Sequence, residues 1–205
     1  MTEIEATQLN NRKINRKGLN SENYFYDFLT ALLSVSDNYL IWPYGLSSQM
    51  TERVFAYELY HQWRLLIDGH EYENLILNGE IRKDGSVIRH ENLKEIYPDF
   101  VLHEQQNNLN QQLIICEIKT SRALQHKNGK AQLKKDIVKL GNAIEELGFK
   151  EALFIQVLDL DNTFENVKPY LQRNFSNFKH TDKIRYIIKD YDRIRFDYLM
   201  NLLTD

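Results

Sequence analysis

Three residues that can bind a cation or transfer a proton lie at the ends of two short apolar segments. Asp99 follows Pro98 at the start of "DFVLH", and Glu117 and Lys119 end the segment "QLIICEIK". Side chains alternate between the two faces of a strand, so Glu117 and Lys119 are expected on the same face as Ile115. The sequence therefore predicts a carboxylate and an amine that project together from the end of a buried strand.

The tract "EQQNNLNQQ" between the two segments predicts a polar hairpin loop, which would place Asp99 beside Glu117. Two neighbouring carboxylates repel each other unless a proton or a cation lies between them. A divalent, oxygen-preferring ion such as Mg²⁺ would relieve that repulsion and keep positions open for water and a phosphate. Lys119 would then orient or deprotonate the attacking water, or stabilise the charge that develops on phosphorus. These residue types indicate metal-assisted hydrolysis of a phosphodiester.

A simpler interpretation of Glu117 and Lys119 is a solvated ion pair at a strand end, which would contribute little to stability. Asp99 argues against it, because a third polar residue is expected at the same place and no packing role explains it. We therefore favour the metal site.

The elements expected to hold these residues follow in the order helix, three strands, helix, strand. The helices are predicted from apolar residues at helical spacing, and the strands from short apolar runs. They cover residues 49–67, 73–82, 99–103, 112–119, 130–147 and 151–160, with a turn at 83–86 and Gly148 as the cap of the second helix. This order predicts an α/β sandwich around a mixed sheet.

Further elements are expected on either side of this core, within a single domain overall. Residues 1–48 are predicted to be a polar lead over 1–20 followed by a helical extension, with a helix over 21–36. Residues 49–158 form the core, and residues 159–205 add a strand at 183–191 and a last helix over 191–203, both packed on the core.

Composition narrows the class of protein. The 205 residues are 42% hydrophobic, which is enough to fill a core. No apolar run is long enough for a membrane span, and the N-terminus has no apolar signal segment. The single cysteine, Cys116, is expected to be a reduced core residue. We therefore expect a cytoplasmic protein without a membrane partner.

Charge is distributed unevenly along the chain. The net charge is −3, yet residues 119–139 hold seven Lys or Arg and one acid, Asp136. A local basic surface on an acidic protein is compatible with nucleic-acid binding. His103 and His126 have no metal-ligand spacing and are expected to be polar surface residues.

These residues and their order resemble the PD-(D/E)xK nuclease superfamily, the restriction-endonuclease-like fold. The motif reads Pro98-Asp99, 17 intervening residues, then Glu117-Ile118-Lys119, and the resemblance covers residues 50–158. It implies an α-β-β-β-α-β core with a mixed central sheet flanked by helices. It also implies metal-dependent cleavage of DNA or, less often, RNA, with Asp99, Glu117 and Ile118 binding Mg²⁺ or Mn²⁺ and Lys119 assisting the nucleophile.

Many members of this superfamily add a catalytic carboxylate from the first helix, and two residues are candidates. Glu52 lies in the first turn, where an acid also complements the helix dipole. Glu58 lies in the middle of the helix, 11 residues before Gly69, a spacing similar to that of the archaeal Holliday-junction resolvases. We favour Glu58 and keep Glu52 as the alternative.

The helix after the motif often contributes polar or basic side chains near the scissile phosphate in this superfamily. The resemblance points to Gln132 and Lys135, and the candidates for flanking phosphates are Lys130, Lys134 and Lys139. For any single lysine, the charged outer face of an amphipathic helix is an adequate explanation.

Two hypotheses follow for function. The first is a metal-dependent nuclease that hydrolyses phosphodiester bonds in DNA, in a defence, restriction or mobile-element setting, as a homodimer or with a protein partner that supplies specificity. The alternative is a catalytically inactive nuclease-fold subunit that binds nucleic acid or a protein partner.

Overall fold

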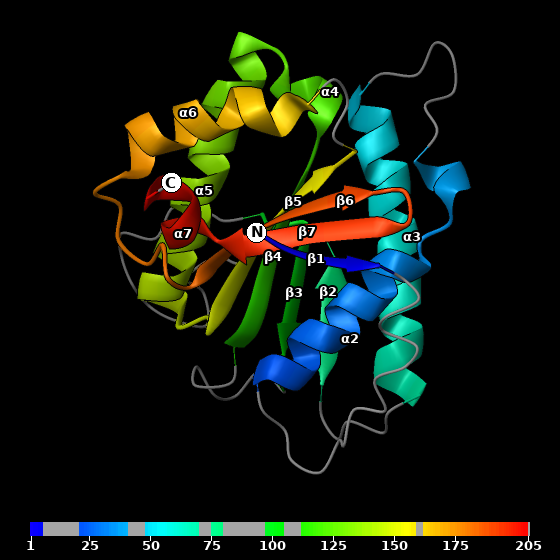
Figure 1. Cartoon of the computed structure of the whole chain (residues 1–205). Coiled ribbons are helices and arrows are strands. Elements are labelled where there is room, and N and C mark those ends of the chain that lie inside the picture. The colour runs from blue at the N-terminus through cyan, green and yellow to red at the C-terminus, as the bar shows by residue number, and fades with distance from the viewer. Residues whose placement is uncertain are drawn as a thin grey trace.

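The strands of this protein lie side by side in one twisted sheet, as the computed structural model in Figure 1 shows. The structure describes residues 1–5, 21–40, 48–69, 75–79, 97–104, 112–158 and 162–204. Over these residues the sheet has seven strands in the order β1-β7-β6-β5-β4-β3-β2. The strands are β1 (Thr2–Glu5), β2 (Ile76–Gly79), β3 (Phe100–His103), β4 (Gln112–Thr120), β5 (Glu151–Val157), β6 (Ile184–Asp190) and β7 (Arg193–Tyr198).

The sheet is mixed. Strands β4, β5 and β6 run parallel, and every other neighbouring pair is antiparallel. Parallel strands are buried on both faces, and β4 and β5 accordingly have buried side chains along almost their whole length.

Helices cover both faces of the sheet (Figure 1). The apolar residues of α2 (Ser21–Ser34) and α3 (Ser48–Gly69) pack on one face. Those of α4 (Ser121–Leu124), α5 (Lys127–Leu147), α6 (Thr163–Phe175) and α7 (Leu199–Thr204) pack on the other. A short 3₁₀ helix, η1 (Asp37–Tyr39), follows α2. Within the described ranges, no helix has the length and apolar character needed to cross a bilayer.

The alternation of side chains along β4 decides where its polar end points. Ile114, Cys116 and Ile118 belong to the core under α2 and α3, whereas Ile115 belongs to the core under α5. Residues two apart share a face, so Glu117 lies on the face of Ile115, as predicted, and this is the α5 side of the sheet. Cys116 is a buried free thiol, and burial raises its pKa, so this cysteine is an unreactive core residue.

The α/β class and the mixed sheet flanked by helices are confirmed. The order α3, β2, β3, β4, α5, β5 is the predicted one, with the single turn α4 inserted after β4. Gly148 ends α5 in the left-handed conformation, with φ 73°, as expected of a glycine cap.

Three predictions about the flanking segments were wrong or incomplete. The segment predicted as a helix over 191–203 forms β7 first, because residues 193–198 alternate in character and pair with β6, and only Leu199–Thr204 is helical. The helix α6 was not predicted, although its buried residues recur at helical spacing on either side of Pro169. Thr2–Glu5 pairs with β7 instead of forming a polar lead. The predicted turn at 83–86 and most of the hairpin loop lie outside the described residues.

The backbone of Gly129, at the start of α5, lies close to the backbone of α4. A Cβ atom added at Gly129 would lie 1.8 Å from the carbonyl oxygen of Ala123, and backbone cannot rotate away as a side chain can. Gly129→Ala should therefore lower the free energy of unfolding by about 1–3 kcal/mol or more. Urea denaturation measures this, and Asn128→Ala, an exposed neighbour, should change it by less than about 0.5 kcal/mol. Equal stability of the two variants would contradict the close approach.

Candidate active site

The hairpin of β3 and β4 brings Asp99 opposite Glu117. Phe100 pairs with Cys116, and the amide of Asp99 donates to the carbonyl of Cys116 at 3.1 Å, which extends the antiparallel ladder by one residue. The Asp99 carboxylate accepts a 2.6 Å hydrogen bond from the amide of Ile118. The prediction that these strands pair and place the two carboxylates together is confirmed.

Lys119 lies between carboxylates that come from two helices. Its Nζ is 3.0 Å from Glu52 Oε1, at the N-terminal end of α3, and 3.7 Å from Asp136 Oδ2 on α5. It also donates to the carbonyl oxygen of Ile118 at 2.8 Å. The Lys119 side chain is 15% exposed, so it lies at the mouth of the site and not in bulk solvent.

A second ammonium group, that of Lys139, shares Asp136 with Lys119 and contacts Glu117 as well. Its Nζ contacts Glu117 Oε1, lies 3.7 Å from Asp136 Oδ1 and donates to the carbonyl oxygen of Tyr97 at 3.2 Å. Gln132 donates to Asp136 Oδ1 at 2.9 Å. Helix α5 therefore supplies one acid, one amine and one amide to the end of β4.

We call these six ionisable residues the strand-end cluster: Glu52, Asp99, Glu117, Lys119, Asp136 and Lys139. Four carboxyl groups face two ammonium groups, so negative charge is in excess when all are ionised. Glu117 and Asp136 are almost fully buried, at 2% exposure each. Buried like charges are expensive unless they are paired.

The acids of the cluster hold their protons more tightly than usual. Burial, reinforced by the Asp99 charge, raises the pKa of Glu117 well above its ordinary value despite the opposing effect of Lys139. Burial likewise raises the pKa of Asp99 and of Glu52, against the lowering effect of Lys119. Clusters of acids with perturbed pKa values beside a cleft are typical of functional sites.

The pKa of Lys119 shifts in the direction that keeps its ammonium group protonated. Burial alone would lower its pKa, but the carboxylates of Glu52, Asp136 and Asp99 outweigh burial, and the pKa of Lys119 is raised. At neutral pH this side chain is therefore an ammonium that donates hydrogen bonds, and it does not accept a proton from water.

The structure favours Glu52, not Glu58, as the helix carboxylate. Glu58 accepts a 2.7 Å hydrogen bond from Gln62 one turn later on α3. Six residues separate the two acids, which turns Glu58 well away from the face that Glu52 presents. The structure therefore brings Glu52, and not the preferred Glu58, to Lys119, because distance along a helix does not fix the direction of a side chain.

The residues of α5 expected to bind nucleic acid do not share one location. Gln132 contacts the cluster through Asp136. Lys130 donates to the carbonyl oxygen of Asn166 at 3.4 Å and Lys134 to Asn174 Oδ1 at 3.2 Å, so both lie against α6. Lys135 lies on the exposed surface. The structure thus turns Lys130 and Lys134 away from the cluster.

Sequence reasoning missed Asp136 and underestimated Lys139. A signal existed, because Asp136 directly precedes Ile137 in the apolar stripe of α5 and is the one acid in a basic segment. A buried polar residue next to a core position demands a partner. The partners are Gln132 and Lys139, four residues before and three after, which is the spacing of one helix face.

A cleft of about 450 Å³ opens beside the cluster. Two of its lining residues, Glu52 and Asp99, belong to the cluster; the others are Arg53, Ala56, Tyr57, Tyr60, Asn78, Gly79 and Phe100. His103, expected at the surface, is fully buried next to it. Its Nδ1 lies 2.6 Å from the carbonyl oxygen of Glu104 and its Nε2 lies 2.8 Å from Asn78 Nδ2. A neutral imidazole with its proton on Nδ1 satisfies both contacts.

The donor atoms of the cluster suit a hard divalent cation. Asp99, Glu117 and the carbonyl of Ile118 offer only oxygen, the preference of Mg²⁺. Over the part of the chain that the structure describes, however, no three acidic, His or Cys side chains converge as a ready-made metal cage. The reason is visible in the contacts, since Lys119 and Lys139 already pair with these oxygens. Binding an ion would require those lysines to turn toward another anion, such as a phosphate.

The raised pKa of Glu117 predicts how stability depends on pH. A carboxyl whose pKa is higher in the folded than in the unfolded protein destabilises the fold once it ionises. This destabilisation is absent below the unfolded pKa and is complete above the folded pKa. Glu117→Gln should therefore raise the midpoint of thermal unfolding at pH 8 relative to wild type, and the gain should disappear by about pH 4, near the ordinary glutamate pKa.

Thermal unfolding followed by circular dichroism across this pH range measures the effect. Glu146→Gln, at an exposed position of α5, is the matched control and should follow wild type throughout. A gain for Glu117→Gln that is the same at pH 4 and pH 8 would show that ionisation of Glu117 is not its source.

Comparison with known proteins gives no further assignment. No protein-family model, no curated protein and no solved structure matches this chain.

Proposed function

We propose that this protein is a metal-dependent nuclease of the PD-(D/E)xK type that hydrolyses phosphodiester bonds in DNA. One observation carries the proposal: Asp99, Glu117 and Lys119 meet at the end of two paired strands, beside a cleft that Glu52 and Asp99 also line. A structural ion pair would not need four buried or half-buried acids in one cluster, two of them lining the cleft.

Two strand-end carboxylates would hold the metal. Asp99 and Glu117, with the carbonyl oxygen of Ile118, supply the oxygen ligands, and the ion would polarise the phosphate and acidify a bound water. The 2.6 Å hydrogen bond from the Ile118 amide keeps one oxygen of Asp99 occupied and fixes the direction of the other. The backbone of β4 thus orients its partner's carboxylate as well as its own.

Lys119 acts as a charged donor. Because Glu52, Asp136 and Asp99 keep it protonated, it stabilises negative charge on a phosphoryl oxygen and orients the attacking water by hydrogen bonding. Of the roles expected from sequence, deprotonation of the water is the one this environment disfavours. Glu52 is the positioning residue that holds the ammonium group at the cleft.

Lys139 supplies the second positive charge. It contacts Glu117 directly, and its side chain is 23% exposed, so it can turn toward a phosphate without crossing the core. Pairing with Glu117 limits the cost of keeping that acid buried until an anion arrives.

The alternative function is a catalytically inactive subunit of the same fold that binds nucleic acid or a protein partner. The pairing of both lysines with the carboxylates favours it, because an ion-pair network can be purely structural. A role in defence, restriction or mobile-element biology rests on analogy for either function.

Cleavage of single-stranded, duplex and branched DNA and of RNA, with Mg²⁺ or Mn²⁺ and with EDTA, tests the proposal. Asp99→Ala and Lys119→Ala should each reduce the rate of metal-dependent cutting by at least about a hundredfold, because each removes a group that contacts the reacting phosphate or its ion. Glu52→Gln should also impair cutting, whereas Glu58→Gln, a matched change on the same helix, should leave the rate near that of wild type.

Circular dichroism of each variant controls for folding. Cutting that survives in Asp99→Ala would assign the activity to another site or to a contaminant. A folded wild-type protein that cuts no substrate with either metal would favour the inactive subunit.

A further inference from the structure

Three of the nine residues that line the cleft beside the strand-end cluster are aromatic residues that the proposed chemistry does not use. Tyr57 and Tyr60 come from α3, and Phe100 begins β3. At about 450 Å³ the cleft lies in the range of small-ligand sites, which is roughly 300–1,000 Å³. It is large enough for one base and its sugar, and it is too small to enclose a base pair with both backbones.

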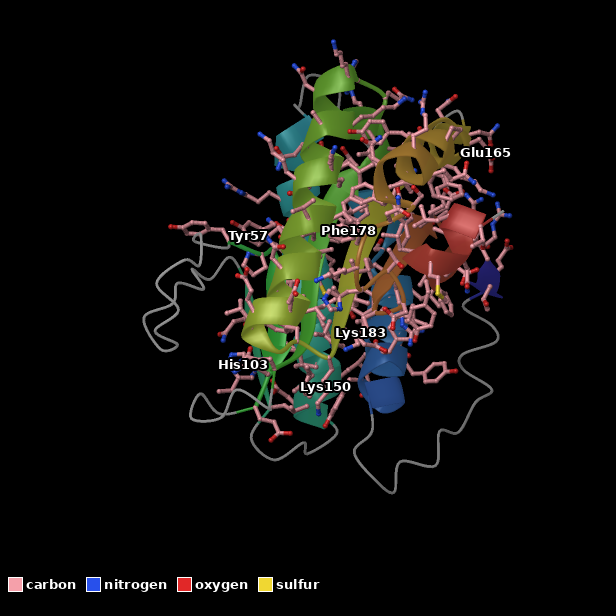
Figure 2. The ribbon with its side chains drawn as sticks, turned by 90° about the vertical axis from the view of Figure 1, so that its left-hand side faces the viewer. Tyr57, His103, Lys150, Glu165, Phe178 and Lys183 are labelled. Carbon is pink, nitrogen blue, oxygen red and sulfur yellow. The ribbon has the colours of Figure 1, made fainter. Side chains whose placement is uncertain are left out.

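Tyr57 presents its ring to solvent at the rim of this cleft. It is 61% exposed, and Figure 2 shows it projecting away from the body of the molecule. Single exposed apolar residues are common, so exposure alone means little. Tyr57, however, lines the same cleft as two acids of the cluster, and Arg53 lies one helical turn before it at the same cleft.

Other residues of the cleft are held in place by hydrogen bonds and ring packing. The hydroxyl of Tyr60 donates to the carbonyl oxygen of Leu77 at 3.2 Å, and the ring lies 6.1 Å from that of Phe100. Buried His103 fixes the amide of Asn78. This part of the cleft is therefore preorganised, with apolar surface and a polar amide side by side.

We propose that this cleft binds an unpaired nucleobase of a DNA strand whose phosphate lies at the strand-end cluster. The inference rests on the proposed nuclease function and names its substrate class as single-stranded or locally unpaired DNA. Glu52 and Asp99 line both the cleft and the cluster, so a nucleotide in the cleft lies next to the reacting groups. The base stacks on the ring of Tyr57, as bases do on aromatic platforms in proteins that bind single strands.

The charge distribution favours an unpaired strand over a duplex. In a duplex both faces of each base are covered by neighbours, so an exposed ring finds no face to stack on. Duplex affinity depends instead on many lysine and arginine contacts to phosphates. Here Lys130 and Lys134 contact α6, so they do not add to the phosphate contacts that Lys119 and Lys139 would make at the cluster. Stacking at the cleft therefore supplies affinity that a paired base cannot use.

Fluorescence anisotropy with a fluorescein-labelled single-stranded oligodeoxythymidylate tests this inference, in EDTA so that no cutting consumes the probe. Tyr57→Ala should weaken binding by about 5- to 150-fold, the loss that corresponds to one stacked base. Tyr57→Phe keeps the ring and should retain most of the affinity. Tyr191→Ala, which removes a 48% exposed tyrosine outside the cleft, should bind like wild type. A labelled duplex should bind more weakly and show no dependence on Tyr57.

Several results would overturn the inference: no binding of the single strand by wild type, equal binding by Tyr57→Ala, or an equal loss in Tyr191→Ala. Failure here is distinct from failure of the nuclease proposal. Metal-dependent cutting of duplex DNA that ignores Tyr57 would leave the nuclease standing and remove this substrate class. Single-strand binding through Tyr57 without any metal-dependent cutting would support the binding site in the cleft and contradict the nuclease proposal.

Discussion

Four carboxyl groups lie close together where β3 and β4 end, and two lysine ammonium groups allow them to remain there. Without Lys119 and Lys139, the buried acids would have to stay protonated or the local structure would have to open. The pKa values of Glu117, Asp99 and Glu52 remain raised even with both lysines present. The site is therefore under electrostatic strain, and further positive charge is the natural way to relieve it.

Helices on both faces of the sheet contribute residues to the strand-end cluster. Alternation along β4 sends Ile118 into the core under α3 and Glu117 toward α5, so the two cores come together where the strand ends. Helix α3 contributes Glu52 from one side, and α5 contributes Asp136 and Lys139 from the other. Concentrating like charge at one place lowers stability, a cost that proteins commonly accept at functional sites.

Much of this arrangement follows from sequence because it depends on short-range rules. The period of two along a strand and the polar hairpin tract were enough to place Asp99 beside Glu117. Short-range rules could not decide whether Glu52 or Glu58 points toward Lys119, because this depends on the rotation of α3 against the sheet. Asp136 was overlooked because a charged residue on an amphipathic helix is usually solvated; its position beside the apolar stripe of α5 was a hint, and the tertiary structure shows that it is buried.

The secondary structure of the C-terminal segment also could not be predicted from local sequence alone. Residues 193–198 alternate in character, yet the choice between strand and helix was settled by the free edge of β6, to which they pair. Strand formation depends on such long-range context more than helix formation does. The surroundings of Lys130 and Lys134 could not be predicted from sequence either, because their contacts with α6 depend on how the helices pack.

The most direct test of the proposed nuclease function is whether Asp99 and Glu117 together bind a divalent ion in the presence of a DNA strand. Calorimetric titration of Mn²⁺ into the protein, saturated with a cleavage-resistant phosphorothioate oligonucleotide, measures this. We expect saturable binding in the wild type that is lost in Asp99→Asn and in Glu117→Gln and preserved in Glu58→Gln. Wild-type protein that binds the oligonucleotide but no Mn²⁺, or variants that bind Mn²⁺ as wild type does, would contradict the central claim.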